Sequence, residues 1–179
     1  IKERPQLQHH VFTLTASDTL ENLTYLVENL PEVSFHIAAK TNVSDRLESF
    51  KKYDNVTLYT NVHHDDIIED LLDQSEIYLD INHWDQVDSI VDRAFEKGKP
   101  VFAFDNVVHR AELGASVFSH QDPEMMVKAI QRQLFGIAVD TVNLVYVFDI
   151  TNHDNCGRSR GGSTFEADLK INEIKLELD

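Results

Sequence analysis

The stretch EIYLDINHWDQVDSIVDRAFEKGKPVFAFDNVVH, residues Glu76–His109, contains one complete strand–helix–strand unit. Its apolar start predicts a strand, Asp85–Lys97 has the periodicity of an amphipathic helix, and Pro100–Asp105 predicts a second strand. Gly98 stands where a helix C-cap is expected. Both strands are continuous apolar runs, which is typical of a parallel sheet buried on both faces. The stretch therefore predicts a β-α-β unit within a larger α/β fold.

The same alternation of strands and helices continues on both sides of this stretch. The expected strands are His10–Ala16, Val33–Ala39, Asn55–Val62, Glu76–Ile81, Pro100–Asp105 and Ala115–His120. The expected helices are Asp18–Leu30, Ser44–Tyr53, His64–Ser75, Asp85–Lys97 and Pro123–Leu134. Six strands and five helices in strict alternation predict an α/β fold with a doubly wound, Rossmann-like parallel sheet and helices on both faces.

Helix starts carry local signals in this sequence. Asp18 and Glu21 have the spacing of a capping box, which predicts that the first helix begins beside them. Ser44 is the expected cap of the second helix. Asp122 is the expected cap of the last helix, with Pro123 at its first position.

The end of the chain breaks this rhythm and predicts a second part. We expect residues 8–135 to form the Rossmann-like domain and residues 136–179 to form a β appendage. Thr141–Thr151 is predicted to be a long strand, and the alternating apolar residues after Ser163 predict another. The loop between them is rich in glycine. A β-hairpin or a similar extension follows from this pattern.

Composition limits the classes of function. The 179 residues carry a formal net charge of −15, and this balance argues against a nucleic-acid-binding protein. Cys156 is the only cysteine, so no internal disulfide forms, and a reducing compartment such as the cytoplasm fits. No stretch has the length of a membrane span, and the start lacks the apolar core of a signal peptide. Because Ile1 is not an initiator methionine, we expect the chain to be a piece of a longer protein.

Several segments resemble a known family. The Glu76–His109 unit is similar to the C-terminal half of GT-B glycosyltransferases of the family-4 type. TLTASDTLENLTYLVENLPEVSFHIAA, YDNVTLYTNV, IYLDINH and VDRAFEKGKPVFAFDNVVH resemble, more closely, the non-catalytic stabilising partner in the paired glycosyltransferases of the bacterial accessory Sec system. The resemblance covers roughly residues 11–134 and leaves out the tail.

The resemblance implies a nucleotide-sugar site at the carboxyl ends of the strands, but with altered residues. Family-4 enzymes present two glutamates seven residues apart, and these positions fall here on Gln86 and Arg93, neither of which is acidic. A shift of one residue would place Asp85 and Asp92 there instead. The basic pair that offsets the pyrophosphate has only Lys40 and Arg46 as candidates. The implied donor chemistry is absent or weakened, so we assign no catalytic residue.

The residues expected to contact a nucleotide sugar or a protein partner follow the strands. They are Ser17, Lys40, His83, Gln86, Asp105, Asn106 and His109. We expect no metal site, because His63 and His64 are adjacent residues at a predicted helix start. No cofactor is expected beyond a UDP-sugar ligand.

Three functions remain open from the sequence. The resemblance implies a stabilising, acceptor-binding partner of a catalytic N-acetylglucosaminyltransferase that O-glycosylates serine-rich repeat adhesins. That partner would form a hetero-oligomer, bind a Ser/Thr-rich acceptor protein, and lie in the cytoplasm, with peripheral membrane association allowed. The second alternative is a fragment of an active retaining UDP-sugar glycosyltransferase. The third is an interaction domain with no role in sugar chemistry.

Overall fold

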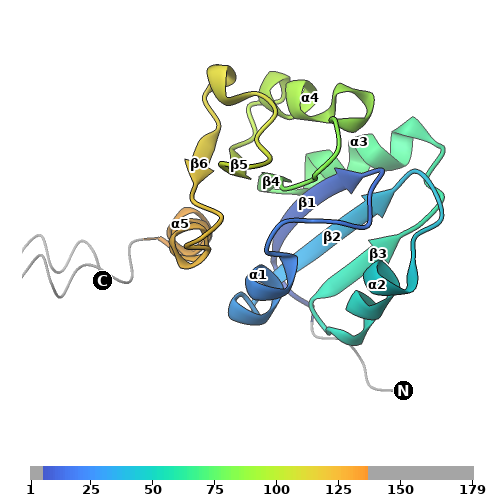
Figure 1. Ribbon diagram of the computed structural model, residues 1–179, viewed down its shortest axis with the longest axis horizontal. Helices are drawn as coiled ribbons and strands as arrows, with labels where there is room; N and C mark the ends of the chain where they lie inside the picture. The colour runs from blue at the N-terminus through green and yellow to red at the C-terminus, as the bar shows by residue number, and fades with distance from the viewer. Residues whose placement is uncertain (1–5, 137–179) are drawn as a thin grey trace, which may run out of the picture. The chain divides into compact units, whose positions relative to one another are not determined.

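The computed structural model describes residues 6–136, and its centre is a six-stranded, all-parallel sheet (Figure 1). The strands lie in the order β3-β2-β1-β4-β5-β6. Their bounds are β1 His9–Thr15, β2 Val33–Ala39, β3 Val56–Tyr59, β4 Ile77–Asp80, β5 Val101–Phe104 and β6 Ser116–Phe118. The predicted doubly wound parallel sheet is confirmed.

Four α-helices and three short 3-10 turns connect these strands, and a fifth helix follows β6 within the described residues. The helices are α1 Leu23–Asn29, α2 Asp45–Glu48, α3 Asp65–Gln74, α4 Ile90–Glu96 and α5 Glu124–Phe135. The 3-10 turns are η1 Ser49–Lys52, η2 Val87–Ser89 and η3 Ala111–Leu113. The sheet belongs to the first of two compact units, which ends at Val127 within α5. The two strands predicted for residues 136–179 lie outside the described residues.

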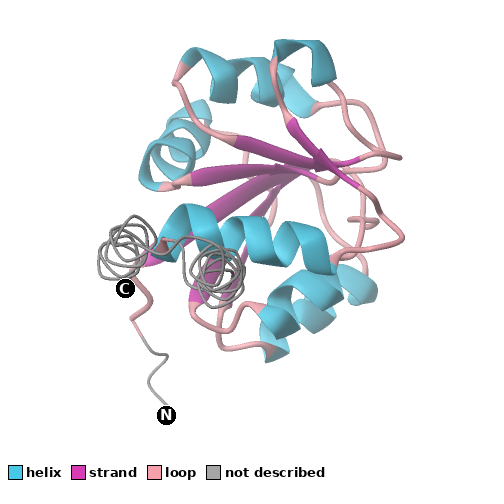
Figure 2. Ribbon diagram, turned by 90° about the vertical axis from the view of Figure 1, so that its left-hand side faces the viewer, coloured by secondary structure: helices cyan, strands magenta, loops and turns pink. Residues whose placement is uncertain are grey.

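Helices cover both faces of the sheet (Figure 2). On one face, Phe12, Leu14 and Tyr78 pack against apolar side chains of α3 and α4. The rings of Phe12 and Tyr78 meet edge to face, with their centroids 5.8 Å apart. Figure 1 shows α1 and α2 on the other face, as right-handed connections on the two sides of β1 require.

Two predicted helix starts are wrong, and both errors lie near the carboxyl ends of the strands. α1 begins at Leu23 behind Asn22, which has a left-handed backbone (φ 52°), so Glu21 lies before the helix and does not cap it. α4 begins at Ile90, five residues later than predicted, because Asp88 and Ser89 both have positive φ angles, of 50° and 52°. The residues before each helix therefore belong to the loops at the carboxyl ends of the strands.

Candidate functional site

The strand order reverses between β1 and β4, since the chain runs outward on one side to β3 and on the other to β6. Ligands of parallel α/β sheets bind outside the carboxyl ends of the strands at such a reversal. The loops that follow β1, β4 and β5 meet at this edge, which we call the strand-end edge. It holds three groups of polar side chains.

The first group is built on Asp80, the last residue of β4. Its carboxylate is buried and accepts two hydrogen bonds from His109, at 2.8 Å from the backbone N–H and 2.5 Å from Nδ1. The other ring nitrogen of His109, Nε2, lies 2.6 Å from the carbonyl oxygen of Trp84. A carboxylate and a carbonyl both only accept, so each ring nitrogen carries a proton and His109 is an imidazolium. The hydrogen bond to Asp80 is the main reason that the pKa of His109 is raised.

The second group is built on Glu21. Its Oε2 accepts hydrogen bonds from Nε2 of His83, at 2.7 Å, and from Nδ2 of Asn106, at 2.8 Å. Glu21 therefore joins the loops after β1, β4 and β5 at one carboxylate oxygen. Two of the predicted residues, His83 and Asn106, are brought together by a residue that the sequence placed in a capping box.

Buried Asn82 adds a further connection between the first two loops. Its Oδ1 accepts hydrogen bonds from the Thr15 hydroxyl, at 3.2 Å, and from the backbone N–H of Trp84, also at 3.2 Å. The predicted residue Ser17 lies in the turn that follows Thr15, where its hydroxyl accepts a hydrogen bond from Thr19 N–H at 3.0 Å. Ser17 thus shapes the turn after β1.

The third group surrounds the start of α4 and engages Lys40 and Gln86. Lys40 forms an ion pair with Asp88, one of the two residues with positive φ. Gln86 donates to Oδ2 of Asp92 at 2.9 Å and accepts from the backbone N–H of Val91 at 2.9 Å. Gln86 is therefore a structural cap for α4. Both predicted residues make contacts within the chain.

Arg93, at the second position where family-4 enzymes carry glutamate, extends to α3 and away from the strand-end loops. Its guanidinium pairs with Glu69 and lies 3.1 Å from Oδ1 of Asp65. Lys97, one turn later, lies 2.7 Å from Glu69 and 2.5 Å from Asp73. An ion-pair ladder between Arg93 and Lys97 of α4 and three acidic residues of α3 joins the two helices. Arg93 is consequently a packing residue.

Asp105 lies apart from the three groups. Its Oδ1 accepts from the backbone N–H of His120 at 2.9 Å and lies 2.6 Å from Nδ1 of the same residue. These contacts, the backbone hydrogen bond first, hold the pKa of Asp105 below its usual value. Asp105 fastens the loop after β5 to the end of β6.

Three residues of this edge are not among the contact residues predicted from the sequence: Asp80, Glu21 and Trp84. Asp80 was included in a predicted strand, although a charged residue that ends an apolar run is a signal of a buried, paired carboxylate. The side chain of Trp84 is 68% exposed, while its backbone is fixed by Asn82 and His109. A rigid, exposed tryptophan beside a charged network is a typical contact point for a ligand or protein partner.

In the described part of the chain, no three side chains of His, Cys, Asp or Glu gather in a way that would hold a metal ion. None of the helices described is long and apolar enough to cross a membrane.

Comparison with known proteins places these features in a family context. The family described as the GftB/GlyA-F C-terminal domain matches residues 11–153. The chain is 42% identical over 123 residues to a Streptococcus agalactiae protein named UDP-N-acetylglucosamine--peptide N-acetylglucosaminyltransferase stabilizing protein GtfB. It is 40% identical over 127 residues to glycosyltransferase GlyB of Streptococcus pneumoniae. The matches cover 68% and 71% of this chain but 28% and 31% of the two relatives, so the chain spans less than a third of their length.

Solved structures give the same placement. The glycosyltransferase GlyE of Streptococcus pneumoniae superposes with a TM-score of 0.67 at 32% identity, over 71% of this chain and 33% of that one. A chain of a GtfA/B complex bound to UDP and GlcNAc superposes with a TM-score of 0.65 at 36% identity, over 74% of this chain and 30% of that one.

Proposed function

Because the chain belongs to the GftB/GlyA-F C-terminal domain family, we propose that it acts as part of a partner that stabilises a catalytic N-acetylglucosaminyltransferase. In this role it does not transfer sugar on its own. The Streptococcus agalactiae relative, 42% identical, is named as a stabilising protein of this kind, which supports the proposal.

The proposal rests mainly on the two positions where family-4 enzymes carry the glutamates that bind the sugar donor. A ribose diol needs two open acceptor oxygens on one carboxylate, as family-4 glutamates provide. Gln86 and Arg93 hold those positions here, and both make contacts within the chain. The neighbouring Asp92 accepts from Gln86 at one oxygen and lies 3.1 Å from Nη1 of Arg110 at the other. At the second position, therefore, neither Arg93 nor Asp92 offers an open carboxylate, while Asp85 beside the first position is exposed.

The strand-end edge suits a protein partner better than a nucleotide. Two of its carboxylates are paired, Asp88 with Lys40 and Asp80 with His109, and Trp84 supplies a large apolar surface on a rigid loop. Exposed tryptophans with a fixed backbone are typical centres of protein interfaces. We propose that this edge contacts either the catalytic subunit or a Ser/Thr-rich acceptor protein. We propose that this hetero-oligomer lies in the cytoplasm, with peripheral membrane association allowed, and the lack of an internal disulfide fits that compartment.

A second candidate is an active UDP-sugar transferase. It is favoured by one specific observation, which is that GlyB and GlyE, both similar to this chain, are named glycosyltransferases. It predicts that the chain binds a UDP-sugar and that substitution of Gln86 or Asp105 abolishes that binding.

The proposal is tested by coexpressing the chain with a catalytic N-acetylglucosaminyltransferase subunit. We expect the two to copurify and the melting temperature of the catalytic subunit to rise, because a ligand that binds only the folded state stabilises it. The expected result for the chain alone is no shift of its own melting temperature with UDP-N-acetylglucosamine. Failure to copurify, together with a UDP-sugar-dependent shift, would favour the second candidate.

A further inference from the structure

The segment that precedes α4 has a backbone conformation that its own sequence disfavours. The apolar residues of α4 continue with helical spacing back to Val87, and the sequence predicts a helix from Asp85 onward. In the structure the helix begins only at Ile90, because Asp88 and Ser89 have left-handed backbones with φ angles of 50° and 52°. A conflict between local sequence preference and structure is typical of strained segments that have a functional role.

The left-handed conformation is least favourable at Ser89. Four non-glycine residues of the described chain have positive φ angles, and all lie in loops that follow the carboxyl ends of strands: Asn22, Asn61, Asp88 and Ser89. Asparagine and aspartate tolerate this conformation because their short polar side chains bond to the local backbone, whereas serine has no such preference. Two consecutive left-handed residues also interrupt the ladder of helical hydrogen bonds.

Contacts between side chains hold this segment in place. Nζ of Lys40, the residue after β2, pairs with Oδ2 of Asp88, and the two side chains are 24% and 44% exposed. Gln86 accepts a 2.9 Å hydrogen bond from the N–H of Val91 and donates one of 2.9 Å to Asp92. In a continuous helix the N–H of Val91 would bond to the carbonyl of residue 87, so the contact with Gln86 is specific to the conformation observed.

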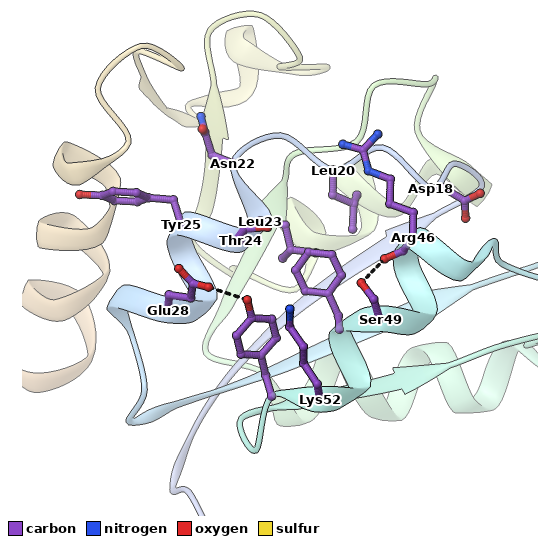
Figure 3. A pocket seen from close by; sticks show the side chains of 12 residues that line it. Asp18, Leu20, Asn22, Leu23, Thr24, Tyr25, Glu28, Arg46, Ser49 and Lys52 are labelled. Carbon is purple, nitrogen blue, oxygen red and sulfur yellow. Dashed lines mark hydrogen bonds between the residues drawn. The ribbon is translucent and has the colours of Figure 1, made fainter.

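Lys40 is the cation that is placed to hold this segment. Arg46, the other candidate cation at this edge, lies on α2 and lines a pocket that α1 and η1 also line (Figure 3). Neither Lys40 nor any of residues 85–89 lines that pocket. The ion pair of Lys40 with Asp88 is therefore independent of what the pocket contains.

We infer that residues 85–89 form a two-state segment, which the ion pair of Lys40 with Asp88 holds in the state observed. We call this the paired state. In the alternative, the helical state, α4 begins at Gln86 behind Asp85 as its cap, and Asp88 lies in the first turn, where the helix dipole favours an acid. Relief of backbone strain and an additional helical turn favour the helical state, whereas the ion pair and the bonds of Gln86 favour the paired state.

The state of this segment determines where Trp84 lies. The loop between β4 and α4 covers residues 81–89 in the paired state and only residues 81–85 in the helical state. A helix advances about 1.5 Å per residue and an extended chain about 3.3 Å, so the shorter loop draws Trp84 toward α4. The backbone contacts of Trp84 with Asn82 and His109 then change. The position of Trp84 is thereby coupled to what Lys40 binds.

The first test breaks the ion pair from either side. Lys40→Met removes the cation but keeps an unbranched apolar stem, and Asp88→Ala removes the acid. We expect the NMR Cα shifts of residues 86–89 to become helical in both variants. The fluorescence emission of Trp84 should also shift, and as the only tryptophan of the chain it reports on this loop alone. Lys51→Met, which breaks the ion pair with Glu48, is the matched control and should leave both measurements unchanged.

The second test relieves the strain of the paired state. Because glycine adopts positive φ angles readily, Ser89→Gly should raise the melting temperature by about 2–4 °C. Combined with Lys40→Met, it should return the Cα shifts and the emission of Trp84 to the values of the parent chain. Asn61→Gly is the matched control, because it makes the same change at another position with φ of 53°. It should not reverse the effect of Lys40→Met.

The inference is overturned if either folded variant, Lys40→Met or Asp88→Ala, keeps the parent Cα shifts at residues 86–89. It is equally overturned if the emission of Trp84 does not change with those shifts, or if Asn61→Gly reverses the effect as fully as Ser89→Gly does. All of these measurements use the chain alone, so they do not depend on copurification with a catalytic subunit.

Discussion

Asp80 and His109 are joined by two hydrogen bonds that connect the end of β4 to the loop after β5, at 2.8 Å to the backbone N–H and 2.5 Å to Nδ1. Because Asp80 is 2% exposed, water contributes little to the solvation of its charge. Through Nε2, His109 carries the connection on to the carbonyl of Trp84. The position of the exposed tryptophan thus depends on a buried ion pair.

Replacing Asp80 with Asn should destabilise the fold. Asn keeps one acceptor oxygen, so one of the two N–H donors of His109 would face an NH2 group, and the charge attraction within the pair would be lost. We expect a loss of about 3 kcal/mol in the free energy of unfolding, measured by urea denaturation at neutral pH. The exposed Glu96→Gln substitution serves as the control. A change below about 0.5 kcal/mol for Asp80→Asn would show that the pair has no structural weight.

Stability should fall at alkaline pH because of His109. Its pKa is raised in the folded state, so the ion pair stabilises fully below the unfolded value of 6.5, and this contribution is lost as the pH rises through the folded pKa. The melting temperature of His109→Gln should therefore vary less with pH on the alkaline side of 6.5 than that of the parent chain. Identical pH profiles for the two proteins would contradict the ion pair.

His36 should cause the protein to lose stability at acid pH. Burial, with a smaller effect of the neighbouring His10, lowers its pKa to about 4. In the unfolded chain His36 binds a proton near pH 6.5, whereas in the folded chain it does so only near pH 4. The free energy of unfolding therefore decreases as the pH falls from 6.5 to about 4. An NMR titration of the ring protons measures this directly. A value for His36 near 6.5 would mean that its ring is solvated.

Replacing Arg93 with Glu should destabilise the fold. Glu at this position would face Asp65 and Glu69 and break the ladder between α3 and α4, so we expect a loss of about 2 kcal/mol in the free energy of unfolding. Gln86→Glu combined with Arg93→Glu would restore both family-4 acids. We expect no affinity for UDP-N-acetylglucosamine in this double variant, measured by calorimetry. Binding of the donor by the folded double variant would mean that only these two side chains separate the chain from a working site.

Trp84 should matter for assembly and not for folding. Its backbone makes the contacts to Asn82 and His109, so Trp84→Ala is expected to change the free energy of unfolding by less than about 0.5 kcal/mol. At the centre of an interface the same change should weaken binding to the catalytic subunit by at least about 30-fold. Ile67→Ala, on α3 and 39% exposed, is the matched apolar control. Equal effects of the two substitutions on binding would remove Trp84 from the interface.

The strands were predictable because long apolar runs have few alternatives in a buried parallel sheet. Ile77–Asp80 and Val101–Phe104 lie inside the predicted ranges, and Gly98, predicted as the C-cap of the intervening helix, lies one residue past the C-cap Lys97 with a positive φ of 69°. The start of α4 was not predictable in this way. Asp88 and Ser89 adopt left-handed conformations that local propensity disfavours and tertiary contacts, including the ion pair of Asp88 with Lys40, sustain.

The candidate site was only partly predictable, because it is formed by hydrogen bonds between side chains of different loops. Position along the chain placed His83, Asn106 and His109 at strand ends correctly. It could not show that Glu21 links the first two, or that Asp80 holds the third. For Arg93, the sequence showed that the residue differs from the family-4 glutamate. It did not show the two partners on α3, which lie 24 and 28 residues away in sequence.

We propose that this chain supports a catalytic transferase without transferring sugar itself. The most direct test of this role is a transfer assay with UDP-N-acetylglucosamine and a serine-rich peptide, read by mass spectrometry. The assay compares the chain alone, the catalytic subunit alone, and both together. We predict no glycopeptide from the chain alone and more from the mixture than from the catalytic subunit by itself. Glycopeptide formed by the purified chain alone would contradict the account.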